Sequence, residues 1–398
     1  MDKQPGSVIS LWERAVAAMA HAFNPKATTS TAPEHADHFA ALDALRGVAA
    51  LAVVFHHFST RIDLGGFFAH GYLAVDFFFV LSGFVIAHAY GPRLANGAMS
   101  VGRFVLIRAI RLLPLVFLGT LIAVAIEWRR PDILDQGVHF KDTLLALVFG
   151  DLLVPTLWPT SLQPNVAFPL NVVVWSLFFE AAANLFYAPL AHLRRGRWIL
   201  VATAAVSAVM IIKGAEIFGA VNFGAEITGF GYGFARVGWS FSLGLALFRW
   251  RAWAPRIPFG WIVAGLVILL GAPDLGGWNA VFDETCVFVL LPMIVFGAIR
   301  TGFGAKGRLV AAISGDLSYP LYATHLPLLR AISFVAAKWD LPLAGRMAVA
   351  GAGTLVVVAA ALLFYVYFDV PVRRALSSLL LSRKSVPPHT SIDACRNT

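Results

Sequence analysis

Long apolar stretches separated by short polar segments run through most of this chain. From residue 42 onward these stretches fall near 42–59, 71–90, 111–127, 171–191, 197–213, 232–248, 258–272, 285–300, 309–335 and 345–368. Most of them approach the ~20 residues that a helix needs to cross ~30 Å of hydrocarbon. A chain surrounded by lipid must satisfy its backbone hydrogen bonds within the spanning segments, which helices do. The pattern predicts an all-α polytopic membrane protein with about ten transmembrane helices.

Basic residues gather in alternate connecting segments. The clusters are Arg93, Arg103, Arg108 and Arg111; Arg194, Arg195 and Arg197; Arg249, Arg251 and Arg256; Arg300, Lys306 and Arg308; and Arg373 and Arg374. Because cytoplasmic segments carry the excess of Lys and Arg, this distribution predicts that both termini are cytoplasmic. The orientation requires that a further apolar run, 143–158, does not cross. That run is interrupted by Asp151 and Pro155, and we interpret it as a re-entrant or interfacial segment.

The composition agrees with a membrane protein and excludes two other classes. Charged residues make up 13% of the 398 residues and hydrophobic residues 59%, with a mean hydropathy of +0.74. A soluble domain carries roughly 25% charged residues, so a disordered chain and an ordinary water-soluble enzyme are both excluded. The two cysteines, Cys286 and Cys395, cannot form a disulfide framework or a cysteine metal cluster, and we expect no metal.

Both ends of the chain are more polar than its centre. Residues 1–40 are predicted to form a cytoplasmic tail, in which Trp12, Val16, Met19 and Phe23 recur at helical spacing. An amphipathic helix lying on the membrane and an unstructured tail both fit this segment. Residues 41–375 are predicted to form the transmembrane domain, and residues 376–398 a second cytoplasmic tail.

Two basic groups share one face of the first predicted span. Arg46 and His57 are eleven residues apart, so at ~100° per residue they lie within ~20° of each other and about 16 Å apart along the helix. One face then carries a cation at the inner surface and an imidazole near the middle of the membrane. Ionisable groups inside spans are costly and indicate function. A structural interpretation also fits, in which Arg46 pairs with Asp43 at the membrane surface.

Further polar groups occur in the third and fourth spans. Arg108 and Arg111 share a helix face at i and i+3, which suits the binding of phosphates, although arginines at a membrane boundary also simply set topology. Ser176, Glu180 and Asn184 form a polar stripe at i, i+4 and i+8. A carboxylate in hydrocarbon needs a partner, and a histidine or arginine facing a shared cavity would serve.

Two other spans carry polar groups that need an explanation. Asp76 lies early in the second span and could be either a catalytic carboxylate or a structural cap. Gly83 lies on the same helix face, where a backbone or a ligand could approach closely. In the ninth span, Pro320 precedes His325. The proline frees backbone carbonyl groups and indicates either a kink or a functional break in the helix.

Together these segments resemble the acyltransferase-3 family of integral-membrane enzymes. In chain order, the matching segments are Leu45-Arg46-Gly47 followed after ten residues by His57, the run 71–84, Arg108 with Arg111, Asn171 through Trp175 and Ser176 to Glu180, Ser318 through Tyr322 to His325, and Pro371 with Arg373 and Arg374. The resemblance extends over about 40–375. The family usually has a Glu before its closing proline, where this chain has Asp369.

The resemblance implies transfer of an acyl group, commonly acetyl, from acyl-CoA on the cytoplasmic side to a hydroxyl of an acceptor. In that scheme His57 is the general base and Glu180 or Asp76 orients its imidazole. Residues expected to bind acyl-CoA are Arg46, Arg108 and Arg111, and secondary site residues are Ser82, Trp175, Ser176, Tyr322 and His325. Acyl-CoA is a co-substrate, and no bound cofactor is expected.

The expected partners follow from the same resemblance. They are acyl-CoA, a glycan or lipid-linked saccharide acceptor, and membrane lipids; a homodimer is compatible, and no nucleic acid is expected. The expected location is the cytoplasmic (inner) membrane of a bacterium.

Three other classes share parts of this pattern. A proton-coupled secondary transporter also has buried charged groups, but the chain shows no internal duplication. A membrane-bound O-acyltransferase of the other large type has its histidine in a later span, without an arginine eleven residues before it. A purely structural membrane protein would leave Glu180 unexplained.

Overall fold

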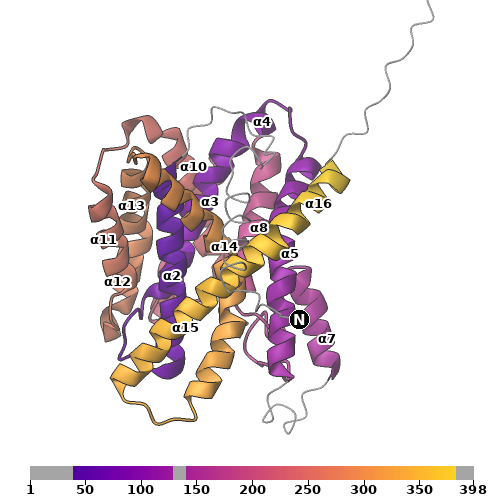
Figure 1. Ribbon diagram of the computed structural model, residues 1–398. Helices are drawn as coiled ribbons and strands as arrows, with labels where there is room; N and C mark the ends of the chain where they lie inside the picture. Colours follow the sequence, from indigo (N-terminus) through magenta and orange to yellow (C-terminus); the bar gives the residue numbers. More distant parts are fainter. Residues whose placement is uncertain (1–38, 129–139, 382–398) are drawn as a thin grey trace, which may run out of the picture.

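The computed structural model describes residues 39–128 and 140–381, and within them every regular element is helical (Figure 1). The α-helices are α2 (Ala40–Ile62), α3 (Ala74–Ala89), α4 (Gly91–Ala95), α5 (Val101–Glu127), α7 (Phe140–Asp151), α8 (Val174–Leu190), α9 (Gly196–Phe218), α10 (Tyr232–Arg249), α11 (Phe259–Leu270), α12 (Asn279–Thr285), α13 (Leu291–Ala298), α14 (Ala305–Ala336), α15 (Leu343–Phe364) and α16 (Val370–Leu381). Two π-helical turns, Cys286–Leu290 and Tyr365–Asp369, join α12 to α13 and α15 to α16. The amphipathic helix considered for residues 12–23 lies outside the described residues.

The all-helical prediction is confirmed, but fewer helices meet the requirements of a membrane span than expected. Six segments of the described chain are long and apolar enough to cross a membrane: Ala40–Ile62, Gly71–Ala89, Val101–Glu127, Gly196–Phe218, Gly276–Ala298 and Leu343–Leu381. The other four predicted ranges also coincide with helices. Of these, α8 has 17 residues and α11 has 12, while α10 and α14 contain more polar residues.

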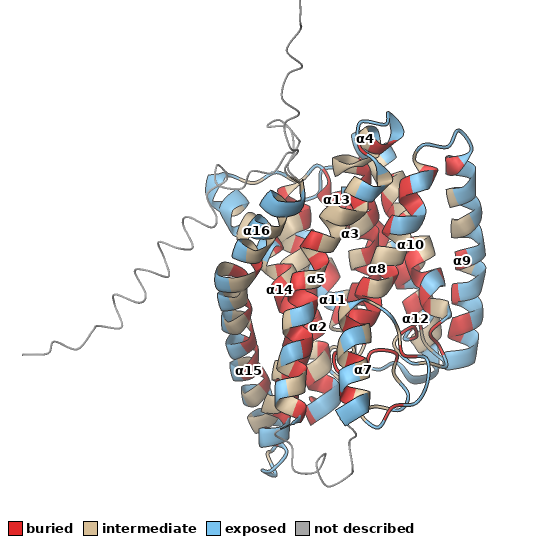
Figure 2. Ribbon diagram, turned by 90° about the vertical axis from the view of Figure 1, so that its right-hand side faces the viewer, coloured by how far each residue is buried: buried red, intermediate tan, exposed pale blue. Residues whose placement is uncertain are grey.

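The helices form a bundle whose buried centre lies on α2, α3, α5, α8 and α14 (Figure 2). The flanking helices α9 and α15 expose apolar side chains on their outer faces, among them Val201, Val206, Leu355 and Leu363. Exposed apolar faces of this kind are what lipid solvates. In Figure 1, α4 and α16 lie at one end of the bundle, and α7 and the connection between α14 and α15 lie at the other.

The segment predicted to be re-entrant contains the short helix α7. Its 12 residues rise ~18 Å, which is less than the ~30 Å of a hydrocarbon core. The chain then turns at Leu153, which has a positive φ of 54°. Figures 1 and 2 both show α7 beside one half of α5.

Two prolines interrupt the backbone hydrogen bonding of α14. Pro327 has no N–H to donate to the carbonyl group of Ala323, and Asn171 Nδ2 donates to that oxygen instead, at 2.9 Å. The side chain of Asn171, just before α8, therefore ties α8 to α14. The second proline, Pro320, lies within the same helix, five residues before His325.

Backbones of α3 and α10 touch at two glycines. A Cβ added at Gly83 would lie 2.1 Å from the carbonyl oxygen of Phe241, and one added at Gly244 would lie 2.0 Å from that of Val80. Close approach of small residues is a common way for helices to associate in membranes. The predicted approach to Gly83 is thus made by the backbone of α10.

We expect Gly83→Ala to destabilise the bundle by about 1–3 kcal/mol, because the new methyl group forces α3 and α10 apart. Gly260→Ala in α11 is the matched control, since nothing lies within 4 Å of the added Cβ. Thermal unfolding of the purified variants in detergent measures the difference. Equal midpoints for the two variants would contradict the contact.

Candidate active site

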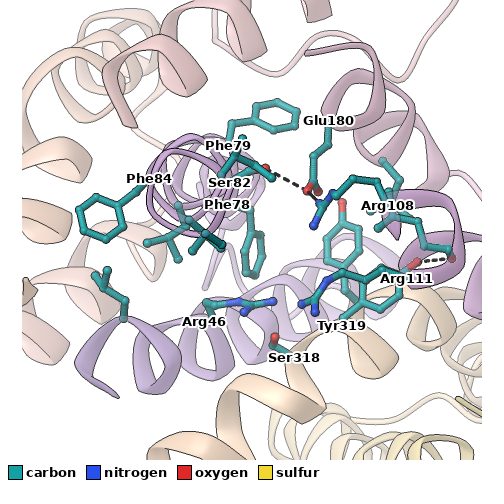
Figure 3. A pocket seen from close by; sticks show the side chains of 18 of the residues that line it. Arg46, Phe78, Phe79, Ser82, Phe84, Arg108, Arg111, Glu180, Ser318 and Tyr319 are labelled. Carbon is teal, nitrogen blue, oxygen red and sulfur yellow. Dashed lines mark hydrogen bonds and ion pairs between the residues drawn. The ribbon is translucent and has the colours of Figure 1, made fainter. Parts of the chain in front are cut away.

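A cavity of about 340 Å³ opens among α2, α3, α5, α8 and α14 (Figure 3). Among its lining residues are seven of the predicted site residues: Arg46, Ser82, Arg108, Arg111, Ser176, Glu180 and Tyr322. Phe39, which precedes α2, also lines the cavity. Its ring centroid lies 4.9 Å from that of Phe84 and 5.2 Å from that of His88, near the end of α3. The cavity therefore lies towards the end of the bundle where α2 begins and α4 follows α3.

One of the three arginines of the cavity pairs with a carboxylate on another helix. Arg108 Nη2 lies 2.5 Å from Glu180 Oε1, and Ser82 donates a hydrogen bond of 2.9 Å to the same oxygen (Figure 3). Glu180 was predicted to need a partner, and it has two: Arg108 on α5 and Ser82 on α3. Glu180 neutralises Arg108 and holds α3, α5 and α8 together around the cavity.

The other two arginines point towards each other across the cavity (Figure 3). Arg46 lies 3.6 Å from Asp43 on its own helix, as the structural interpretation of the sequence expected. Among the residues that the structure describes, Arg111 makes no ion pair. Three arginines against the two carboxylates of Asp43 and Glu180 leave the cavity with an excess of positive charge.

Aromatic side chains close the far end of the cavity. The hydroxyl groups of Ser176 and Tyr322 lie 2.5 Å apart, and Ser176 also donates to the carbonyl oxygen of Val173 at 3.1 Å. With its own hydrogen donated to Val173, Ser176 accepts from Tyr322. The ring of Phe78 stands edge-on to that of Tyr322, with centroids 5.7 Å apart. Both rings line the cavity.

Behind this aromatic layer lie two histidines. The rings of His57 on α2 and His325 on α14 have centroids 5.2 Å apart, and His325 lies 5.9 Å from the ring of Tyr322. Neither histidine belongs to the lining of the cavity. Arg46 and His57 thus both face the bundle, and the cavity that Arg46 lines ends one aromatic layer before His57.

Asp76 meets an arginine and not the predicted histidine. Arg236 on α10 donates to both of its carboxylate oxygens, with Nη2–Oδ2 at 2.6 Å and Nε–Oδ1 at 3.2 Å. Both side chains have 0% exposure, and the Arg236 guanidinium also lies over the ring of Trp175. Asp76 and Trp175 therefore belong to a buried structural cluster outside the cavity lining. Since Glu180 holds Arg108, neither predicted carboxylate orients His57.

A second polar cluster, which the sequence did not reveal, lies near the start of α3. Asp283 accepts hydrogen bonds from Tyr72 (2.6 Å) and the backbone N–H of Val221 (2.8 Å), and it pairs with His70 Nδ1 at 2.7 Å. These groups come from three separate segments, so sequence spacing carries no sign of their meeting. No group of three His, Cys, Asp or Glu side chains in the described chain is arranged to hold a metal ion.

Three residues near the site were missed, and two of them had a visible signal. Arg236 is a cation inside the predicted span 232–248, which by itself indicates a buried partner. Tyr319 lies within the recognised segment 318–325; it lines the cavity and donates to the carbonyl oxygen of Leu112 at 2.5 Å. Phe78 had no signal, because the second span contains several similar phenylalanines.

We expect Asp76→Leu to destabilise the protein by about 3–5 kcal/mol, because it leaves Arg236 charged and unpaired in the interior. Adding Arg236→Met should restore most of that loss, since an apolar pair of similar size replaces a buried ion pair well. Thermal unfolding in detergent follows both variants. An Asp76→Leu protein of normal stability would contradict the structural role of the Asp76–Arg236 pair.

The residues that line the cavity, and the two histidines behind it, all lie in the part of the chain that matches a known family. A family model described as an acyltransferase domain matches residues 39–366. "Protein 2 in picA locus" of Rhizobium radiobacter is 38% identical over 197 residues, which cover 46% of this chain and 97% of that protein. No solved structure was found to match. Because the family model matches most of its length, the chain belongs to the acyltransferase-3 family.

Proposed function

We propose that this protein is an O-acyltransferase that moves an acyl group, acetyl in the simplest case, from acyl-CoA to a hydroxyl of a glycan or lipid-linked saccharide. The observation that carries the proposal is the arginine-rich cavity, whose far end reaches the aromatic layer in front of two histidines. Family membership favours this activity over the proton-coupled transporter that the buried charges also suggested.

The donor binds through its phosphates at the arginines. Coenzyme A is an anion with a nucleotide at one end, and planar guanidinium groups bind phosphate oxygens two at a time. Arg111 and Arg46 face each other across the cavity, so phosphates between them would meet donors from α5 and α2 at once (Figure 3). Arg108 adds positive charge but is held by Glu180.

The thin pantetheine arm of the donor occupies the apolar part of the cavity. Phe78 and Phe79 line this part, and Tyr322 with its hydrogen bond to Ser176 closes it. His57 lies about 16 Å along α2 from Arg46, at eleven residues of helix rise. A thioester carried on an extended arm spans this separation once the rings of Phe78 and Tyr322 turn aside.

His57 then acts as the general base. The oxygen of the acceptor hydroxyl attacks the thioester carbonyl carbon while His57 removes its proton, and the bond between carbon and sulfur breaks. The leaving thiolate takes the proton from His57, which returns to its neutral form. The overall reaction releases no net proton, and general-base assistance of this kind is worth ~10² to 10⁴ in rate.

The proposal also includes an orientation. The end of the bundle that holds the arginines and α4 faces the cytoplasm, where acyl-CoA is made, and the acceptor approaches from the opposite side. With all ten predicted ranges crossing a bacterial inner membrane and α7 remaining in one half, Ala40 and α16 both lie on the cytoplasmic side.

Inverted membrane vesicles test the activity and its sidedness together. Given acetyl-CoA labelled in the acetyl group, vesicles containing the protein should release free CoA and transfer label to membrane glycan or lipid. His57→Ala should lower this rate by ~10² to 10⁴, while right-side-out vesicles should give little transfer. Wild-type vesicles that release no more CoA than His57→Ala vesicles would exclude the proposal.

Arg111→Ala should raise the KM for acyl-CoA about tenfold or more, because one charged hydrogen bond to a phosphate is worth roughly 1.5–3 kcal/mol. The kcat should change little, since Arg111 lies far from the reacting atoms. Arg308→Ala is the matched control, an exposed arginine whose guanidinium donates to the carbonyl oxygen of Phe303. If both variants respond to acyl-CoA like the wild type, Arg111 does not bind the donor.

A further inference from the structure

The imidazole of His325 is fixed in one tautomer by its own helix. Its Nδ1 lies 2.8 Å from the carbonyl oxygen of Tyr322 and 3.1 Å from that of Leu321. Carbonyl oxygens only accept hydrogen bonds, so Nδ1 must carry the hydrogen. A neutral imidazole has a single N–H, which leaves Nε2 of His325 with a lone pair.

This lone pair lies in the interior without a hydrogen-bond donor. His325 has 0% exposure, and its Nε2 has no partner among the described residues. A buried polar atom without a partner is destabilising and calls for an explanation, such as a catalytic role. A neighbouring group that can supply a donor is His57, whose ring centroid lies 5.2 Å away with the planes inclined by 31°.

We propose that His325 is the positioning residue for His57: its Nε2 accepts the N–H of His57, so that the other ring nitrogen of His57 faces the acceptor hydroxyl. This inference rests on the proposed function and deepens its mechanism. A centroid separation of 5.2 Å lets facing nitrogens approach the ~2.9 Å of a hydrogen bond after a modest rotation of His57. Catalytic hydrogen bonds are often long in a protein without substrate and shorten in the reactive complex.

His325 thereby does what a carboxylate does in a Ser-His-Asp triad. It fixes the tautomer and direction of the base, and its lone pair stabilises the imidazolium that forms when His57 takes the acceptor proton. The proton later passes to the leaving thiolate, and His325 keeps its own Nδ1 hydrogen throughout. The two carboxylates that could have taken this role are occupied, Asp76 by Arg236 and Glu180 by Arg108.

The kinetics of the full-length protein in vesicles, with acetyl-CoA as donor, test this role. We expect His325→Leu to lower kcat about 10²-fold while the KM for acetyl-CoA stays within twofold, since His325 does not line the donor cavity. His325→Gln should recover much of the loss, because the amide can donate to the backbone and accept from His57. Thr324→Val is the control: Thr324 is fully buried on α14 and bonds its own helix at Pro320, and kcat should be unchanged.

A double variant separates positioning from a structural role. Because His325 acts through His57, His57→Ala with His325→Leu should be no slower than His57→Ala alone. Equal losses of kcat in the Leu and Gln variants, or a loss explained entirely by less folded protein, would overturn the inference. Full activity of His57→Ala would instead overturn the proposed base, so the two failures are distinguishable.

Discussion

A charged side chain among hydrocarbon is stable only when an opposing group meets it, and the helices of this bundle are arranged around that constraint. Three arginine–carboxylate pairs join helices that are distant in sequence: Arg236 with Asp76 between α10 and α3, Arg108 with Glu180 between α5 and α8, and Arg330 with Glu127 between α14 and α5. Replacing such a pair by apolar residues can be neutral, whereas removing one partner is strongly destabilising. The pairs therefore specify which helices are neighbours more than they add net stability.

The same constraint makes the cavity suited to binding an anion. Arg111 points into the same space as Arg46 and Arg108, yet no carboxylate of the described chain pairs with it (Figure 3). An unpaired cation that lines an open cavity is suited to bind an anion from solution. Glu180 keeps the excess small by neutralising Arg108, and the phosphates of the proposed donor would supply the negative charge that Arg111 lacks.

Sequence reasoning predicted the helices well, because apolar length and periodicity are local properties of the chain. All ten predicted ranges coincide with helices. Five of the polar residues singled out on the first, third and fourth spans line one cavity: Arg46, Arg108, Arg111, Ser176 and Glu180. The partners of those residues were harder to predict. Asp76 was matched to His57, but it meets Arg236, because which of several buried cations a carboxylate meets depends on how distant helices pack.

Local signals were also ambiguous where one residue serves two roles. Pro320 and His325 indicated either a kink or a functional break, and the proline indeed lies within a continuous α14 while the histidine bonds that helix's carbonyl groups. The spacing between them gives no information on the free Nε2 of His325. That atom matters only because α2 brings His57 against α14, a contact between residues far apart in sequence.

The same constraint favours an imidazole over a carboxylate beside the proposed base, His57. A carboxylate next to His57 would need a countercharge of its own whenever His57 is neutral, deep in a region of low dielectric. A neutral His325, whose hydrogen the backbone carbonyl groups already hold, can orient His57 without adding a buried charge. The two rings themselves then carry charge only while the imidazolium is present. The enzyme proposed here would thus separate its two electrostatic tasks, with permanent charge at the arginines for the donor and transient charge at the histidines for the transfer.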